Sequence, residues 1–172
     1  MPTILTHALI PLAAGLALGP TRVAKPVIIT GMVLAMLPDA DVVGFKLGIE
    51  YADQFGHRGA SHAILVAAVV AALVTAVMRP ERLRVAFAFL FASMASHGLL
   101  DAFTNGGLGP ALLWPFSDAC YFAAVTPIRV SPIGAGFFSA RGMAVILSEA
   151  LWVWSPLALI ALSGRFWLRQ KT

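Results

Sequence analysis

Charged residues are scarce in this sequence. They account for 12% of the 172 residues, whereas apolar residues account for 59%. A soluble domain contains about 25% charged and about 45–50% apolar residues. A chain this short cannot enclose such an apolar excess in a water-soluble globule, because small domains leave much of their surface exposed. The composition therefore predicts a protein embedded in membrane lipid.

Cysteine is nearly absent, and so are several familiar motifs. The one cysteine, Cys120, excludes an internal disulfide and a cysteine-rich zinc site. Although the net charge is +4, no basic run is interleaved with aromatic residues, so no nucleic-acid partner is expected. The sequence also contains no glycine-rich phosphate loop and no dinucleotide fingerprint.

Long apolar segments dominate the chain instead. Five of them are apolar enough to lie in or against a bilayer: residues 4–18, 26–37, 60–78, 85–103 and 143–162. A helix needs about 20 apolar residues to span a bilayer, so the last three are expected to cross, and the two shorter ones to cross at a tilt or only in part. Lipid excludes exposed strand edges. The sequence thus predicts a single all-α domain over residues 1–172, an integral membrane bundle of about five hydrophobic helices with a long loop (residues 104–142) between the fourth and the fifth.

The basic residues predict how this bundle is oriented. If every segment crosses, eight of them lie on one side, in short loops or the C-terminal tail: Arg22, Lys25, Arg79, Arg82, Arg84, Arg165, Arg169 and Lys171. The other four are spread over much more chain. Positive residues in short loops mark the cytoplasmic face, so the N-terminus is predicted outside and the C-terminus inside.

The histidines and most carboxylates fall on the side opposite to these basic residues. All four histidines are expected at the outer ends of segments, and of the eight acids only Glu81 belongs to the cytoplasmic side. The topology rule does not require this sorting, because it concerns lysine and arginine. Residues far apart in sequence are therefore predicted to meet in one layer, which indicates a functional site.

Two motifs in this layer have spacings that suit a metal ion. His97 and Asp101 are four residues apart, so a helix places them on one face with about 5–6 Å between their Cβ atoms. Asp39 and Asp41 directly follow Pro38, and carboxylates so close together repel one another unless a cation neutralises them. The alternatives are a structural hydrogen-bonded pair for the first motif and solvated acids in a helix-ending turn for the second.

A third motif contains His57 and His62. They are five residues apart and do not share a helix face, but a junction from loop to helix allows both to face one point. Ser61 is expected to cap the third helix. Arg58 is expected either to contact a phosphate group or to lie among lipid headgroups.

Two further residues complete the predicted site. His7 stands among apolar neighbours, where a histidine is often only a packed core residue, but its expected level in the bundle favours a ligand. Glu149 lies two turns into the fifth segment, where a buried acid needs a partner, and is expected to be a metal ligand or a general base.

The predicted metal ligands are His7, Asp39, Asp41, His57, His62, His97 and Asp101, and the predicted catalytic groups are Glu149, Asp41 and Arg58. Imidazole and carboxylate ligands without thiolate fit zinc, with manganese as the alternative. These ligands outnumber what one tetrahedral zinc requires, so one to three ions are expected. A hydrolytic zinc lowers the pKa of its bound water toward neutrality.

The motifs carry a resemblance to a known family. They are Thr6-His7, residues 36–41 (MLPDAD), 55–62 (FGHRGASH) and 96–101 (SHGLLD), with further agreement over residues 113–118 and 148–152. Through them the whole chain resembles the YdjM/YbcI-like family of bacterial inner-membrane proteins, described as metal-dependent hydrolases. The resemblance implies a multi-pass protein of the bacterial inner membrane, and with the predicted topology its site faces the periplasm.

A more remote similarity concerns the substrate. The spacing of His97 and Asp101, with histidines and aspartates on several helices, is similar to the pattern of zinc-dependent phospholipase C and the S1/P1-type nucleases. That similarity implies a phosphoester substrate, lipid-linked if it is reached from the membrane. Two alternatives remain open: a metal-binding or metal-transporting membrane protein without hydrolase activity, and a scaffold for a cytosolic partner.

Overall fold

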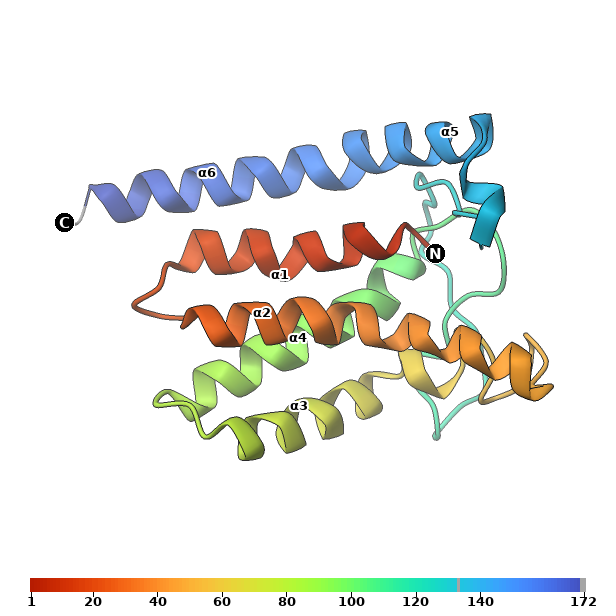
Figure 1. Ribbon diagram of the computed structural model, residues 1–172, viewed down its shortest axis with the longest axis horizontal. Coiled ribbons are helices and arrows are strands. Elements are labelled where there is room, and N and C mark those ends of the chain that lie inside the picture. Colours follow the sequence, from red (N-terminus) through yellow and green to blue (C-terminus); the bar gives the residue numbers. More distant parts are fainter. Residues whose placement is uncertain (133, 171–172) are drawn as a thin grey trace.

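The computed structural model describes residues 1–132 and 134–170, and these residues form a bundle of helices (Figure 1). The helices are α1 (Ile4–Leu18), α2 (Lys25–Met36), α3 (Ile64–Met78), α4 (Leu83–Asp101), α5 (Ala140–Glu149) and α6 (Ser155–Arg169). A single π turn, Ala150–Trp154, joins α5 to α6 in one continuous helix. The predicted all-α bundle of five helices is therefore confirmed, and so is the long connection between the fourth and the fifth.

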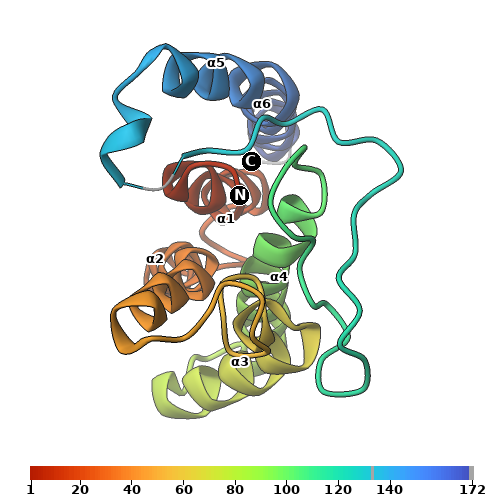
Figure 2. The same cartoon turned by 90° about the vertical axis from the view of Figure 1, so that its right-hand side faces the viewer.

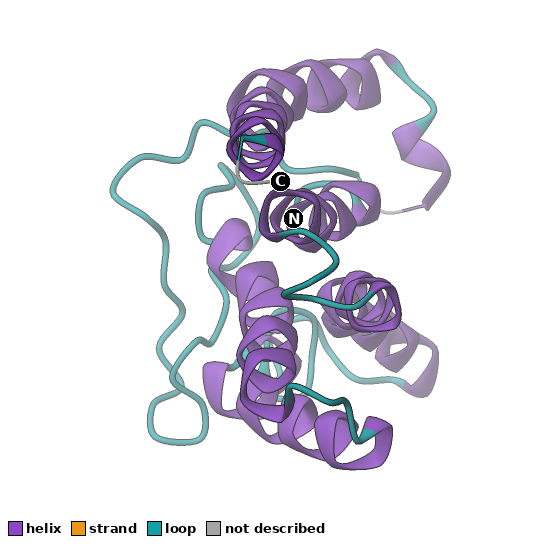
Figure 3. Ribbon diagram, turned by 90° about the vertical axis from the view of Figure 1, so that its left-hand side faces the viewer, coloured by secondary structure: helices purple, strands orange, loops and turns teal. Residues whose placement is uncertain are grey.

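The bundle is arranged around α1 and α4. Helix α1 packs between α2 and α6, and α4 contacts α1, α2 and α3. In Figure 1, the α5–α6 helix, α1 and α2 lie one below another, while α4 runs obliquely behind α2. The end views in Figures 2 and 3 show the connection from α4 to α5 as an irregular segment along one flank of the bundle.

Small side chains allow the helices to approach closely. The buried core of α2, α3 and α4 combines alanines with a few large residues, among them Leu34, Phe89, Leu90 and Met94. On the outside of the bundle, large apolar side chains such as Val77 and Leu162 remain exposed. Helices that pack through small residues and expose large apolar ones are typical of a bundle dissolved in lipid. Among the described residues, three helical stretches are long and apolar enough to span a membrane: Lys25–Leu47, Leu83–Asp101 and Ala140–Arg169.

The helix ends sort into two groups at opposite ends of the bundle. The α1–α2 and α3–α4 turns and the end of α6 lie at one end, and these segments carry the predicted cytoplasmic basic residues except Lys171, which lies outside the described residues. The start of α1, the end of α4, and the segments after α2 and before α3 lie at the opposite end (Figure 1), which we call the site end. Both short segments, α1 and α2, thus run from one end of the bundle to the other.

Several predicted boundaries differ from the structure. The second segment does not end at residue 37, because the chain continues as the 3₁₀ helix η1 (Leu37–Leu47), whose tighter winding begins next to Pro38. The third α-helix starts at Ile64, because the extended backbone of Ala63 separates it from the 3₁₀ helix η2 (Ala60–His62). The fifth helix is longer than expected at both ends.

The contact between α2 and α4 at Gly31 allows a test of this packing. A Cβ atom there would lie 2.7 Å from Cε1 of Phe89 and 2.8 Å from Oγ of Ser93. Overpacking of this kind costs about 1–3 kcal/mol. We expect Gly31→Leu to lower the thermal unfolding midpoint in detergent, whereas Val33→Leu, on the exposed side of the same helix, should leave it nearly unchanged. Equal midpoints for the two variants would contradict the α2–α4 contact.

Candidate metal centre

Five side chains from separate parts of the chain meet at the site end of the bundle. They are His7 from α1, Asp39 from η1, His62 from η2, and His97 and Asp101 from α4, and we call them the centre. Each is at most 4% exposed. All five are among the ligands predicted from the sequence.

A glycine in α4 allows two of these elements to come together. A Cβ atom at Gly98 would lie 2.6 Å from the backbone oxygen of His62. Any larger residue at this position would therefore push η2, and with it the imidazole of His62, away from α4.

The ligand atoms of the centre converge without bonding one another. Nε2 of His97 lies 3.2 Å from Oδ1 of Asp39, and Nε2 of His62 lies 4.0 Å from the same atom. Nε2 of His62 and of His7 lie 3.5 and 3.6 Å from the carboxylate of Asp101. Two sets of three residues, His7–His97–Asp101 and Asp39–His62–His97, each offer atoms that lie within 4.8 Å of one another.

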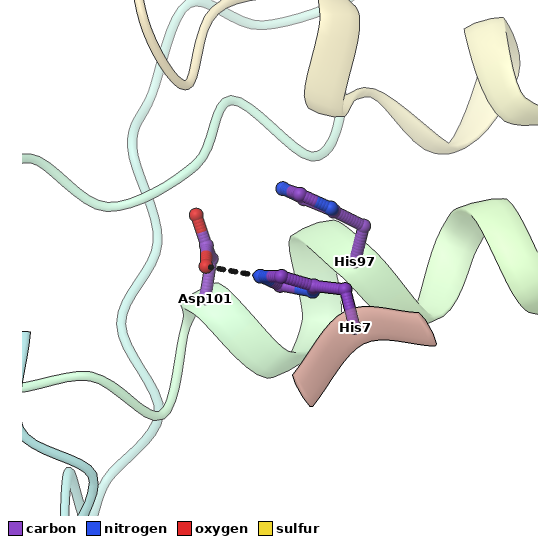
Figure 4. Close-up of side chains that lie close together, drawn as sticks. All are labelled: His7, His97 and Asp101. Carbon is purple, nitrogen blue, oxygen red and sulfur yellow. Dashed lines mark ion pairs between the residues drawn. The ribbon is translucent and has the colours of Figure 1, made fainter. Parts of the chain in front are cut away.

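Figure 4 shows the first of these sets. The rings of His7 and His97 are stacked, with 3.7 Å between centroids and 12° between planes, and the dashed line marks the approach of His7 to Asp101. The ring of His62 meets that of His97 edge to face at 4.7 Å. Three imidazoles and two carboxylates thus surround one small volume.

The same atoms lack hydrogen-bond partners. Nε2 of all three histidines and both carboxylate oxygens of Asp39 and Asp101 are enclosed and accept or donate no hydrogen bond within the described residues. Buried charge without compensation costs several kcal/mol. Donors of this type, unpaired and converging, are the donor set that a divalent transition metal prefers. The residues present therefore fit a metal ion.

Hydrogen bonds behind the centre fix which nitrogen of His97 and of His62 faces inward. Nδ1 of His97 lies 2.6 Å from the backbone oxygen of Ala35 and must donate to it, which leaves the lone pair on Nε2. Nδ1 of His62 lies 2.9 Å from Oγ of Ser61 and 3.4 Å from Asp41. Metal-ligating histidines are commonly oriented by such partners.

The residues around His62 also control its protonation. Burial lowers the pKa of His62, but Asp101 and Asp41 outweigh burial and raise the pKa to about 9. A proton on this ring therefore compensates part of the negative charge as long as no cation does. Because a metal binds the deprotonated imidazole, metal binding would release that proton.

His57 and Asp41, also predicted as ligands, form a separate pair beside the centre. Nδ1 of His57 donates to Oδ1 of Asp41 at 2.6 Å, and the ring of His57 meets that of His62 edge to face at 5.7 Å. Asp41 also accepts from Oγ of Ser61 at 2.7 Å and from the backbone N–H of Arg58. Asp41 thus connects the loop of His57 to the ring of His62, and neither His57 nor Asp41 belongs to the two converging sets.

Arg58 is buried at the site end rather than exposed to headgroups. Its guanidinium donates to the backbone oxygens of Gly106 and Leu108 and to Oγ1 of Thr104, and Nε faces Asp101 at 3.1 Å. At 2% exposure its side chain is enclosed by protein, so the interpretation that it lies among the headgroups of the surrounding bilayer is wrong. These bonds favour a positioning role for Arg58, and direct contact with a phosphate stays a prediction.

Glu149 also has partners other than the centre. It is fully buried, and it accepts hydrogen bonds from the backbone N–H of Thr3 at 2.5 Å and from the hydroxyls of Thr3 and Thr6 at 2.6 Å. Trp154, in the π turn that follows Glu149, donates to Thr6 at 2.8 Å. The fifth helix thereby clamps the start of α1, one residue before His7.

Hydroxyl groups at the site end form more of the hydrogen bonds that hold the site together than the sequence indicated. Ser61 does not cap α3, because Ala63 occupies the N-cap position and Ser61 bonds Asp41 instead. The contacts of Thr3 and Thr6 with Glu149 join residues more than 140 positions apart. Threonine and serine are common, so no pattern in the sequence distinguishes the ones that hold a site.

The fold and the centre define a helical membrane protein that encloses a cluster of histidines and aspartates. The model of the family described as YdjM inner membrane protein matches residues 1–171, and the chain belongs to this family. It is 42% identical to the inner membrane protein YbcI of Escherichia coli (strain K12), over 99% of this chain and 100% of that protein. No solved structure matches the chain. These relatives, with the apolar helices, support a location in the inner membrane.

The bonds of Glu149 yield a test that separates clamping from metal ligation. Glu149→Gln removes the charge but keeps the side-chain volume, and loss of a hydrogen bond to a charged group costs about 1.5–3 kcal/mol. We expect a lower thermal midpoint in detergent but an unchanged metal content after reconstitution, measured by elemental analysis. Loss of the metal from a folded Glu149→Gln protein would make Glu149 a ligand, which is one of the two roles that the sequence predicted.

Proposed function

We propose that this protein is a membrane-bound, metal-dependent hydrolase of phosphoesters, with its site end facing the periplasm. The observation that carries the proposal is the convergence of three imidazoles and two carboxylates whose enclosed ligand atoms have no other partners. Evolution of such a cluster purely for stability is unfavourable, because an apolar core of the same volume would cost less.

The charge of the site end supports a divalent cation. Asp39, Asp41 and Asp101 lie together with one paired guanidinium, that of Arg58. With neutral imidazoles these groups leave a net charge of minus two. One divalent ion balances that charge. The imidazole and carboxylate ligands make zinc the metal we propose, with manganese as the alternative.

The hydrogen bond of His97 limits how many metal ions the centre can hold. His97 has one free nitrogen, because Nδ1 is bonded to Ala35, so it can bind only one ion although it belongs to both converging sets. A second ion would therefore be held by the remaining histidine and carboxylate of the other set. We thus expect one or two ions rather than three.

Residues next to the centre supply the groups that hydrolysis needs. A bound divalent metal polarises a phosphoryl oxygen and makes a water more acidic. His57, held by Asp41, lines a cavity beside the centre and is placed to move a proton there. The phosphoester class follows the similarity of the ligand pattern to zinc-dependent phospholipase C, and the membrane setting favours a lipid-linked substrate.

A second candidate is a metal-binding membrane protein without hydrolase activity. One observation favours it: the ligand atoms of the centre are enclosed on all sides, so a substrate reaches them only if the wall formed by His57 and Arg58 moves. In that case the metal would hold η1, η2, α1 and α4 together without taking part in a reaction.

Two matched histidine variants separate these candidates. We expect His97→Ala to abolish the binding of stoichiometric zinc or manganese by the purified protein, and His57→Ala to retain this binding. The reason is that His97 belongs to both converging sets, whereas His57 belongs to neither. Phosphodiesterase activity should be lost in His97→Ala and fall by about 10²–10⁴-fold in His57→Ala. Metal binding without any activity on soluble or lipid phosphodiesters would favour the second candidate. Wild-type protein that binds no divalent metal would sink both.

The native cysteine provides a test of the orientation. Cys120 is exposed in the connection from α4 to α5, at the site end. In spheroplasts, we expect a membrane-impermeant maleimide to label it without lysis. The matched control carries Cys120→Ser and Thr21→Cys, which moves the thiol to the exposed α1–α2 turn at the opposite end, and should be labelled only after lysis. The reverse pattern would place the centre on the cytoplasmic side.

A further inference from the structure

A cavity of about 460 Å³ opens beside the centre at the site end. It lies between the segment that follows η1 and the segment that follows α4. Its lining includes Tyr51, Asp53, His57, Arg58, Trp114 and Asp118.

The walls of this cavity are fixed to each other. Arg58 donates from its guanidinium to the backbone oxygen of Leu108, and its own backbone oxygen accepts from the N–H of Ala111 at 2.9 Å. Nε1 of Trp114 donates to Oε1 of Gln54 at 3.3 Å. Because these hydrogen bonds connect the two walls, the cavity is a fixed feature of the fold.

One buried polar group in the lining has an unused nitrogen. His57 is 3% exposed and donates from Nδ1 to Asp41. Its Nε2 makes no hydrogen bond within the described part of the chain. The ring thus offers one polar atom to whatever occupies the cavity.

The charged side chains of the lining disfavour the binding of anions. Asp53 and Asp118 are exposed and have no ion-pair partner among the described residues. The one cation in the lining, Arg58, is bonded to backbone oxygens and to Asp101, so it does not neutralise them. A wholly anionic ligand would be repelled, whereas a ligand with a cationic group would be attracted by the carboxylates and by the aromatic faces of Tyr51 and Trp114.

Exposed apolar side chains next to the cavity indicate where the ligand comes from. Phe55, Leu113 and Phe116 are 55%, 47% and 83% exposed, and the ring of Phe55 packs edge to face against that of Trp114. These apolar side chains lie beside a polar cavity at the end of the bundle. Such an arrangement is suited to the membrane–water interface, where the acyl chains of lipids meet the headgroups.

We propose that this cavity binds the headgroup of a phospholipid whose alcohol carries an ammonium group. The phosphate lies beside His57, nearest the centre, and the ammonium lies between Asp53 and Asp118 against Tyr51 and Trp114. This inference rests on the proposed function, since it names the substrate class of the same site, but the binding itself requires no catalysis.

Calorimetric titration of the purified protein in detergent tests the proposal. The ligands are dihexanoyl phosphatidylethanolamine, dihexanoyl phosphatidylglycerol and free phosphoethanolamine. We expect the ethanolamine lipid to bind about tenfold more tightly than the glycerol lipid, and more tightly than free phosphoethanolamine, which lacks the acyl chains. Equal affinity for the two lipids would overturn the ammonium site. Free phosphoethanolamine binding as tightly as the ethanolamine lipid would overturn the assignment to a membrane lipid.

Matched charge variants identify the residues responsible. Asp53→Asn combined with Asp118→Asn should remove the preference for the ethanolamine lipid. Glu50→Gln combined with Glu81→Gln removes the same charge from exposed positions outside the lining and should leave the preference intact. A preference that survives in the aspartate variant, with an unchanged thermal midpoint, would contradict the role of these two carboxylates.

A further variant separates this inference from the proposed function. His97→Ala lacks a ligand of the centre but keeps every lining residue of the cavity, so its headgroup preference should equal that of the wild type. In the wild-type protein, a headgroup preference without bound metal or activity would overturn the proposed function and leave the headgroup site intact. Bound metal and activity without a headgroup preference would overturn the headgroup site and leave the proposed function intact.

Discussion

The carboxylates of Asp39 and Asp101 lie enclosed among three imidazoles, and the rest of the site end follows from the need to compensate them. Within the part of the chain that the structure describes, neither carboxylate accepts a hydrogen bond, and of the two only Asp101 has an arginine beside it. Removing such charges from water costs several kcal/mol each unless an opposite charge takes the place of the solvent. The histidines, Arg58 and the donors behind them all contribute to this compensation, which is why so many polar contacts gather at one end of an otherwise apolar bundle.

The two ends of the molecule accordingly follow different physical rules. Along most of its length the bundle packs alanine and glycine against a few large apolar side chains, and its outer surface is apolar. At the site end, backbone that is not α-helical becomes frequent, with η1, η2 and the connection from α4 to α5. Inside a membrane, irregular backbone is tolerated only where it is buried in protein or lines a cavity. The buried residues of η2 meet the first condition, and residues 57–59 and 108–109 of the cavity lining meet the second.

The sequence predicted the general fold and included all five residues of the centre among its candidates, and it did so for a physical reason. Apolar length and basic loops determine how many helices cross and which ends share a side, so His7 and His97 could be placed in one layer without any contact being known. The four-residue spacing between His97 and Asp101 then predicted that Asp101 faces the same site. The roles of Arg58 and Glu149 were not accessible in this way, because their partners are backbone oxygens and threonines whose approach depends on the complete packing. Their charges alone suggested an encounter with substrate or metal, whereas the geometry gives them internal partners.

The clamp between Glu149 and the start of α1 has a consequence for how the protein is made. His7 is synthesised early, yet the side chain that holds its neighbours Thr3 and Thr6 is synthesised more than 140 residues later. During insertion, the hydroxyls at the start of α1 therefore lack this carboxylate until α5 has entered the bilayer. Assembly of the cluster is thereby coupled to the synthesis of α5, so a chain truncated before α5 would insert without the contact that holds the segment next to His7.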